Sequence, residues 1–313
     1  MKDLRPLDLI STNIKGYIEN RRKFLTCNPQ YFIHYGSMTK SKIEEEANRH
    51  SVSIELVDYG LTTSESLKLK AQEKHRSEKN IRNARAWAKQ YFSLPLTPDY
   101  IENIGKLIDP ISNPHGFRKG KVRITGARVS PPSAEKIDRE LRIFLWENEQ
   151  LDDGIEKAIH THFNIGRIHP FDDGNGRTSR LLQDIILHDE RLPIAMISLY
   201  ERPEYIQKIE AAAFSYNEKE ANLNLDMTHK LSSLRELASN YKHLSAAEVE
   251  KGKYLAKTLL SYRITPEQHA FYDFIALKVL HGLSEELKRL YPSEEEMIKY
   301  LKKTKIKNQN RKH

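Results

Sequence analysis

The chain has 313 residues, of which 38% are hydrophobic and 30% charged, a balance that allows a buried core in a soluble protein. The net charge is +8, but residues 302–313 hold six Lys and Arg and no acid, so the rest of the chain is close to neutral. The single cysteine, Cys27, excludes an intrachain disulfide and a cysteine-rich zinc site, and no apolar run approaches the ~20 residues of a membrane helix.

Residues 1–110 predict a helical N-terminal region. The first residues, MKDLRPLDLISTN, lack the apolar segment of a secretory signal, so we expect a cytoplasmic protein. The polar stretch 64–91 is rich in Lys, Arg and Ala and indicates one or two exposed helices. Four prolines between residues 95 and 114 then interrupt the helical pattern.

Residues 120–132, GKVRITGARVSPP, break with the helical pattern. Val122 and Ile124 alternate with charged residues, Thr125-Gly126 is a turn signal, and a Pro-Pro pair ends the segment. This pattern predicts a short β-hairpin. Apolar residues with helical spacing resume after Ser133.

The C-terminal third predicts amphipathic helices joined by short turns. Three Ser or Thr residues are followed three positions later by Glu or Gln, the spacing of a capping box: Ser245 with Glu248, Thr265 with Gln268, and Ser293 with Glu296. We expect a boundary in the polar stretch 215–226, a helical extension over 226–301 and a basic tail over 302–313. The expected fold class is therefore all-α with one short β-hairpin.

The segment from Ile168 to Leu182, IHPFDDGNGRTSRLL, concentrates the chemistry of the chain. Gly174 and Gly176 permit a sharp turn into a helix, whose first N–H groups and dipole attract an anion. Arg177 and Arg180 lie three apart on the first turn of that helix, where both guanidinium groups can bind phosphate oxygens. The pattern predicts a phosphate-binding site.

Two further side chains of this segment suit a reaction at that site. Asp173 offers the oxygen ligands that Mg²⁺ takes. His169 is the nearby group with an unperturbed pKa close to 7, so it is the natural general base. Taken singly, each has a simpler explanation, because a histidine often ends a helix and Asp172-Asp173 before glycine is a common turn signal.

Other nucleotide and metal sites fit the sequence less well. The absence of G-x-x-x-x-G-K-[ST] excludes a P-loop, and no strand precedes GNGRTS as a Rossmann fold requires. His160 and His162 have no third ligand at a suitable spacing. We interpret His162, on an apolar helix face, as a core histidine.

The stretch HPFDDGNGRTSR matches the signature of the Fic family, His-x-Phe-x-Asp/Glu-Gly-Asn-Gly-Arg-x-x-Arg, at every defined position. The chain therefore resembles that family. Upstream, GFRKGKVRITGARVSPP over residues 116–132 is similar to the family's flap hairpin, and the resemblance continues to about residue 215. It implies a helical Fic core over residues 111–225.

Members of the Fic family typically transfer AMP from ATP to a protein hydroxyl. The resemblance implies an enzyme that uses ATP and Mg²⁺ and modifies Ser, Thr or Tyr of a target protein. It implies that His169 deprotonates the hydroxyl, that Asp173 binds Mg²⁺ and that Phe171 anchors the loop. The nucleotide-binding residues that it implies are Asp172, Gly174, Asn175, Gly176, Arg177, Arg180 and Tyr205. The flap residues that would clamp a target strand are Val122, Arg123, Ile124 and Thr125.

The helix after the signature departs from the family pattern. Tyr205 matches the first tyrosine of a Tyr-Tyr pair near the nucleotide, but Ile206 replaces the second and Ala213 replaces a following Asn. Relatives move UMP, phosphate or phosphocholine on the same loop. Transfer of another phosphate-containing group, or removal of AMP, is therefore the alternative activity.

Many Fic proteins carry an inhibitory helix with the pattern Ser/Thr-x-x-x-Glu-Gly/Asn, whose glutamate pairs with the second arginine of the signature. KSKIEEEANR over residues 40–49 resembles a common form of it and aligns Glu44 with the inhibitory glutamate. The resemblance thus makes Glu44 the candidate inhibitory residue, which would pair with Arg180. Lys40 and Glu45 depart from the pattern, and Ser41 with Glu44 equally has the spacing of a capping box.

Two other classes of function compete with the enzyme. One is a non-catalytic nucleotide-binding protein, which would need neither His169 nor Asp173. The other is a DNA-associated regulator that binds nucleic acid through residues 302–313. The expected partners are a protein substrate at the flap and an antitoxin or the chain's own inhibitory helix. No membrane association is expected, and the sequence does not predict an oligomeric state.

Overall fold

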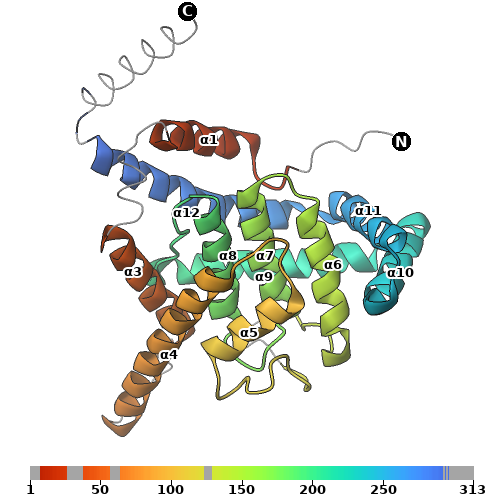
Figure 1. Cartoon of the computed structure of the whole chain (residues 1–313), viewed down its shortest axis with the longest axis horizontal. Helices are drawn as coiled ribbons and strands as arrows, with labels where there is room; N and C mark the ends of the chain where they lie inside the picture. The colour runs from red at the N-terminus through yellow and green to blue at the C-terminus, as the bar shows by residue number, and fades with distance from the viewer. Residues whose placement is uncertain are drawn as a thin grey trace, which may run out of the picture.

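Two antiparallel helices form the centre of the molecule. In this computed structural model, which describes residues 8–26, 38–56, 64–122, 129–291, 293 and 295, α7 (Gly154–Ile168) and α8 (Asn175–Asp189) lie side by side. Nearly every side chain of both helices is buried, including Ile159, Phe163 and Leu182. The segment that joins them is the predicted phosphate loop, so the loop is fixed at both ends by the core (Figure 1).

Four helices surround this central pair. They are α5 (Pro98–Ile108), α6 (Ile137–Glu149), α9 (Arg202–Ala221) and α12 (Pro266–Leu290). The sequence determines where α5 begins. The Thr97 side chain accepts a hydrogen bond from the Tyr100 N–H. Pro98 occupies the first helical turn, where its missing N–H costs no hydrogen bond. Its buried face, which includes Ile101 and Ile104, then packs on the core.

The N-terminal helices cover one side of the core. α3 (Met38–Glu55) and α4 (Ser64–Tyr91) pack against each other, and both contact α8. α1 (Thr12–Thr26) packs on α12, where the Ser11 N–H donates to the Asp273 carboxylate at 2.8 Å. This arrangement brings the C-terminal end of α3 to the loop between α7 and α8.

The C-terminal helices form a smaller second core on the opposite side (Figure 1). α10 (Leu225–Ser239) and α11 (Ala246–Arg263) pack on α6 around Trp146 and Leu234. The buried Arg263 at the end of α11 pairs with Glu147 of α6 and with Glu220 of α9. Short 3₁₀ turns lie at Ala134–Lys136, Leu199–Glu201 and Tyr241–His243.

The all-α fold class is confirmed, and no strand occurs among the residues that the structure describes. The predicted hairpin falls mainly on residues 123–128, which lie outside the described residues. The capping boxes at Ser245 and Thr265 are confirmed, whereas Glu296 of the third lies outside the described part. The predicted boundary over 215–226 falls on the end of α9 and the turn into α10. Within the described ranges, none of the helices combines the length and apolarity that crossing a membrane requires.

Candidate active site

The loop between α7 and α8 turns sharply at two residues in the left-handed region. His169 ends α7 with φ 52° and ψ 59°, and its N–H donates to the Ile165 carbonyl at 3.0 Å. Gly174 precedes α8 with φ 78°, a conformation that glycine adopts without a Cβ clash. A left-handed conformation is uncommon for histidine, so neighbouring groups must hold His169 in place.

Phe171 and Asn175 fix the middle of the loop. The Phe171 ring is fully buried beside Phe117, and a Cβ on Gly105 would lie 2.1 Å from it, so α5 must present a glycine there. The Asn175 side chain bonds the Phe171 backbone twice, accepting from its N–H at 2.9 Å and donating to its carbonyl at 2.9 Å. The Asn175 amide therefore ties the loop together, and only the backbone N–H of Asn175 remains for an anion.

Asn113, which the sequence analysis missed, braces the loop from outside. Its Oδ1 accepts from the N–H groups of Asp172 and Asp173 at 3.1 and 3.3 Å. Its Nδ2 donates to the carbonyls of Asp173 and Gly105 at 2.8 and 3.1 Å. Because the side chain is 1% exposed and all its partners are backbone atoms, it holds the loop on α5. The Asp172 side chain itself is exposed.

The His169 imidazole is set up as a neutral base. Its Nδ1 lies 3.2 Å from the Gly166 carbonyl, and because a carbonyl can only accept, Nδ1 carries the proton and Nε2 keeps a free lone pair. Burial lowers the pKa of His169 below its ordinary value, although the bond to Gly166 and the charge of Glu55 act in the opposite direction. The ring is therefore neutral at pH 7 and able to accept a proton.

Arg177 lies between two carboxylates. Its Nη2 is 3.2 Å from Asp173 Oδ2 and 3.3 Å from Asp109 Oδ2, and its Nη1 donates to the Ser77 hydroxyl at 3.3 Å. Asp109, at the end of α5, also accepts from the Ser112 N–H at 3.0 Å. Burial alone would raise the pKa of Asp109, but the Ser112 N–H and the Arg177 charge hold it below its ordinary value. Asp109 could not be identified from the sequence, because its position at the site depends on how α5 packs.

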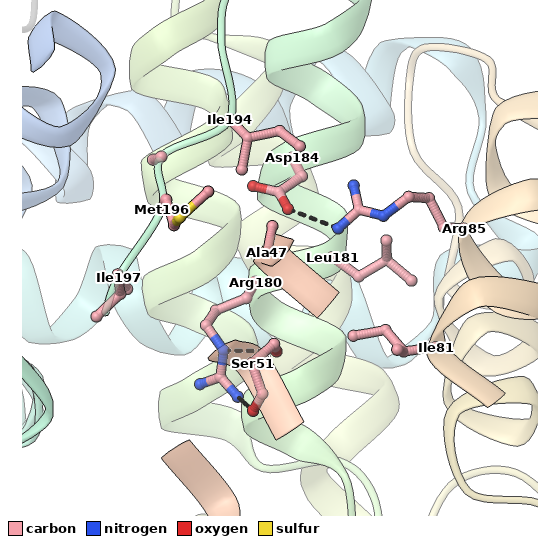
Figure 2. A pocket seen from close by; sticks show the side chains of 11 residues that line it. Ala47, Ser51, Ile81, Arg85, Arg180, Leu181, Asp184, Ile194, Met196 and Ile197 are labelled. Atoms are coloured by element: carbon pink, nitrogen blue, oxygen red, sulfur yellow. Dashed lines mark hydrogen bonds and ion pairs between the residues drawn. The ribbon is translucent and has the colours of Figure 1, made fainter. Parts of the chain in front are cut away.

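Arg180 is bound by the C-terminal end of α3. Its Nη2 lies 2.7 Å from Glu55 Oε1 and 2.9 Å from the Ser51 carbonyl, and its Nε donates to the Ser51 hydroxyl at 2.9 Å. Figure 2 shows Arg180 and Ser51 in contact. Both line a cavity of about 20 Å³ between α3, α4, α8 and residues 194–197. Burial alone would raise the pKa of Glu55, but the charges of Arg180 and Arg177 hold it below its ordinary value.

The Glu55 carboxylate also reaches the first turn of α8. A Cβ on Gly176 would lie 2.2 Å from Glu55 Oε1, so the carboxylate touches the backbone where helix N–H groups favour an anion. The end of α3 is held there by Arg202, whose Nε donates to the Ile54 carbonyl at 2.7 Å. A negative charge of the chain itself thus lies at the predicted phosphate-binding position.

The expected pairing of Glu44 with Arg180 is wrong. Glu44 pairs with Lys89 of α4, and the carboxylate on Arg180 is that of Glu55. The two glutamates are eleven residues apart on one helix, which places them about 16 Å apart along its axis. Ser51 and Glu55 also have the spacing Ser-x-x-x-Glu, with Leu56 in place of the Gly or Asn, so the same pattern at this register was the overlooked signal.

Tyr205 supports Arg180 from the opposite side. The tyrosine is 2% exposed, and its hydroxyl lies 2.9 Å from His162 Nε2 and 3.4 Å from Arg180 Nη1. His162 Nδ1 lies 2.6 Å from Gln183 Oε1, and burial lowers the pKa of His162 to about 3. The interpretation of His162 as a core histidine is confirmed. The Tyr205 hydroxyl is engaged in this network, so a role at the nucleotide stays a prediction.

Of the predicted flap residues, the structure describes Val122, which is partly buried. Arg123, Ile124 and Thr125 lie outside the described residues. Their role at a target strand stays a prediction.

Known proteins similar to this chain share its central region. A model of the Fic/DOC family matches residues 95–187. A protein adenylyltransferase Fic of Nematostella vectensis is 32% identical over 124 residues, 37% of this chain and 29% of that protein. A probable protein adenylyltransferase of Aquifex aeolicus is 37% identical over 103 residues, 32% of this chain and 31% of that protein. The chain thus spans about a third of the length of these curated relatives.

The similarity in structure extends further along the chain. A Fic-domain-containing signalling protein from Bacteroides thetaiotaomicron, solved by crystallography, superposes with a TM-score of 0.55 at 18% identity. The alignment covers 88% of this chain and 97% of that one. At this identity the likeness concerns the fold, and the fold it supports includes helices outside residues 95–187.

The electrostatics of the site predict the protonation of His169. We expect NMR titration of its ring to give a pKa below 6.5, because burial disfavours the charged form. Glu55→Gln should lower this pKa further, since the Glu55 charge favours the imidazolium. Glu44→Gln, a glutamate on the same helix paired with Lys89, is the control and should leave it unchanged. A pKa that rises in Glu55→Gln would contradict this account.

Proposed function

Because the chain contains a Fic/DOC-family domain, we propose that it is a protein adenylyltransferase, which transfers AMP from ATP to a hydroxyl group of a protein. The observation that carries this proposal is the neutral Nε2 of His169 beside a helix N-terminus that bears two arginines. A base and an anion site next to each other suit the attack of a hydroxyl on a phosphate. The curated relatives described above are named adenylyltransferases.

The first turn of α8 supplies the phosphate site. The N–H groups of Asn175, Gly176 and Arg177 have no carbonyl four residues earlier within the helix, so they can bind phosphate oxygens once Glu55 is displaced from Gly176. Arg177 and Arg180 then neutralise the outer phosphates. Both guanidinium groups are already buried and oriented by hydrogen bonds, so little ordering is needed when the nucleotide binds.

His169 performs the proton transfer. Its Nε2 takes the proton of the target hydroxyl, and the hydroxyl oxygen forms a bond to the α-phosphorus of ATP. The bond from that phosphorus to the bridging oxygen breaks, and pyrophosphate leaves with the bond's electron pair. The depressed pKa of His169 keeps Nε2 unprotonated at neutral pH, which is the state the step requires.

The residues at the loop suit a bound Mg²⁺. The Asp173 side chain is 55% exposed and supplies a carboxylate, the hard oxygen ligand that Mg²⁺ takes. The Asp109 carboxylate pairs with the same Arg177 nitrogen, Nη2, as Asp173 does. When bound, Mg²⁺ would neutralise phosphate charge. Asp173 would hold the ion, and Arg177 keeps the Asp173 carboxylate beside the anion site.

Glu55 acts as the inhibitory residue in this proposal. Its carboxylate occupies Arg180 and touches Gly176, so the outer phosphates of ATP and Glu55 compete for the same groups. α3 is held against α8 by further buried contacts. Arg85 of α4 pairs with Asp184 of α8 (Figure 2). The same arginine bonds the Asn48 side chain of α3. Activation therefore requires displacement of the end of α3 or of the Glu55 side chain alone.

Removal of the base tests the reaction directly. The full chain, incubated with labelled ATP, Mg²⁺ and a cell lysate, should transfer AMP to protein. His169→Ala should lower transfer on the order of 10²–10⁴-fold, the usual worth of a general base, while ATP still binds. Transfer by His169→Ala at the rate of the unaltered chain would contradict the assignment of the base.

Removal of the inhibitory carboxylate tests the regulation. Glu55→Gly should raise automodification with labelled ATP on the order of 10–100-fold, because it frees Arg180 from one charge-assisted hydrogen bond. Glu44→Gly removes a glutamate from the same helix and breaks only its pair with Lys89, so it should not activate. Equal activation by both substitutions would mean that loosening α3, rather than freeing Arg180, raises activity.

A further inference from the structure

Arg118 is a buried arginine that binds backbone carbonyls around the candidate active site. It is 3% exposed. Its Nε donates to the His169 carbonyl at 2.7 Å, and its Nη1 donates to the Gly120 carbonyl at 2.9 Å. Its Nη2 donates to the Pro132 carbonyl at 2.5 Å and approaches the Ile168 carbonyl at 3.5 Å.

The backbone of Arg118 contributes as well, since its N–H donates to the Pro170 carbonyl at 2.9 Å. One residue therefore binds three consecutive carbonyls around the catalytic histidine, those of Ile168, His169 and Pro170. These are the carbonyls at the end of α7, where the left-handed conformation of His169 begins.

Arg118 forms no salt bridge with a carboxylate in the part of the chain that the structure describes. The buried arginines Arg167, Arg177, Arg180 and Arg263 each pair with at least one carboxylate. Burial lowers the pKa of Arg118, which the more distant charges of Asp172 and Glu135 only partly offset. The main compensation is the negative end of the α7 dipole and the carbonyls themselves. Arg118 therefore fixes the positions of backbone carbonyls and does not neutralise a carboxylate.

We propose that Arg118 is a positioning residue, which holds the His169 imidazole in register with the two flanks of the segment from Gly120 to Pro132. This inference rests on the proposed function, in which His169 is the base. The planar guanidinium joins His169, Gly120 and Pro132 in one rigid unit. The nitrogen that takes the proton of the target hydroxyl is thereby fixed relative to Gly120 and Pro132.

The guanidinium group is essential to this role, because a lysine cannot bond several carbonyls at once in one plane. Three separate nitrogens of Arg118 point at three carbonyls in a fixed plane. A lysine keeps the positive charge but offers a single nitrogen, so it can replace a purely electrostatic role and not a positioning role. Arg118→Lys therefore separates the two explanations.

The test uses the full chain carrying Glu55→Gly as the parent, with automodification by labelled ATP as the reaction. Arg118→Lys should lower kcat roughly 10–100-fold, because a base displaced by about 1 Å loses on that order of rate. KM for ATP and the ATP dissociation constant should stay within about twofold, since Arg118 bonds none of the phosphate-site residues.

Arg263→Lys is the matched control. Arg263 is equally buried but lies between α11, α6 and α9, away from the loop. Arg263→Lys should lower the melting temperature of the protein without changing kcat per folded molecule. If Arg118→Lys fails to fold, Arg118→Gln, which buries no charge, serves in its place. A kcat within twofold of the parent, or a loss of ATP affinity equal to the loss of kcat, would overturn the proposal.

A second measurement does not depend on transfer. At pH 8, where the ring is neutral, the His169 ring resonances in an NMR spectrum should shift in Arg118→Lys and stay in place in Arg263→Lys. Unshifted resonances in Arg118→Lys would overturn the positioning role. If the parent transfers no AMP, the proposed function fails, and the NMR result alone then decides whether Arg118 positions His169.

Discussion

The proposed regulation of the site depends on the ion pair between Arg180 and Glu55, whose Nη2 and Oε1 atoms lie 2.7 Å apart. It joins α3 to α8, and the same carboxylate lies against Gly176, where a phosphate would bind. Tyr205 and Ser51 hold the guanidinium from two other sides, so Arg180 cannot easily turn away. The chain thus places its own carboxylate where the outer phosphates of a nucleotide would compete for the same cation. A local interaction thereby links the packing of the N-terminal helices to the chemistry of the loop.

The rest of the loop between α7 and α8 is held by hydrogen bonds. Its backbone turns twice through left-handed conformations, and buried side chains bond the backbone N–H and carbonyl groups that have no partner within a helix. Asn113 ties the loop to α5, Asn175 closes it internally, and Arg118 binds the carbonyls at the end of α7. Preorganisation of this kind keeps Nε2 of His169 available and the loop backbone in place, so that displacement of Glu55 is the rearrangement that remains.

The all-α fold and the loop were predictable because their signals are local. Glycines mark the turn, Thr and Ser mark helix starts, and apolar spacing marks the buried faces of α7 and α8. The partner of Arg180 was not predictable in the same way, since Glu55 is 125 residues away in sequence. The resemblance aligned Glu44, where Lys40 departs from Ser-x-x-x-Glu, whereas Ser51 and Glu55 keep that spacing and depart only at Leu56. The roles of Asn113 and Arg118 were not predictable either. Both bind backbone atoms, which every residue has, so their partners carry no sequence signal.

In the proposed function Glu55 and the outer phosphates of ATP exclude each other, and calorimetry of nucleotide binding tests this most directly. Glu55→Gln keeps the size of the side chain and removes its charge. ATP affinity should then rise roughly tenfold, or about 1.4 kcal/mol, whereas AMP affinity should stay unchanged because AMP has no outer phosphates. An equal rise for ATP and AMP, or no rise for ATP, would contradict the claim that Glu55 occupies the position of those phosphates.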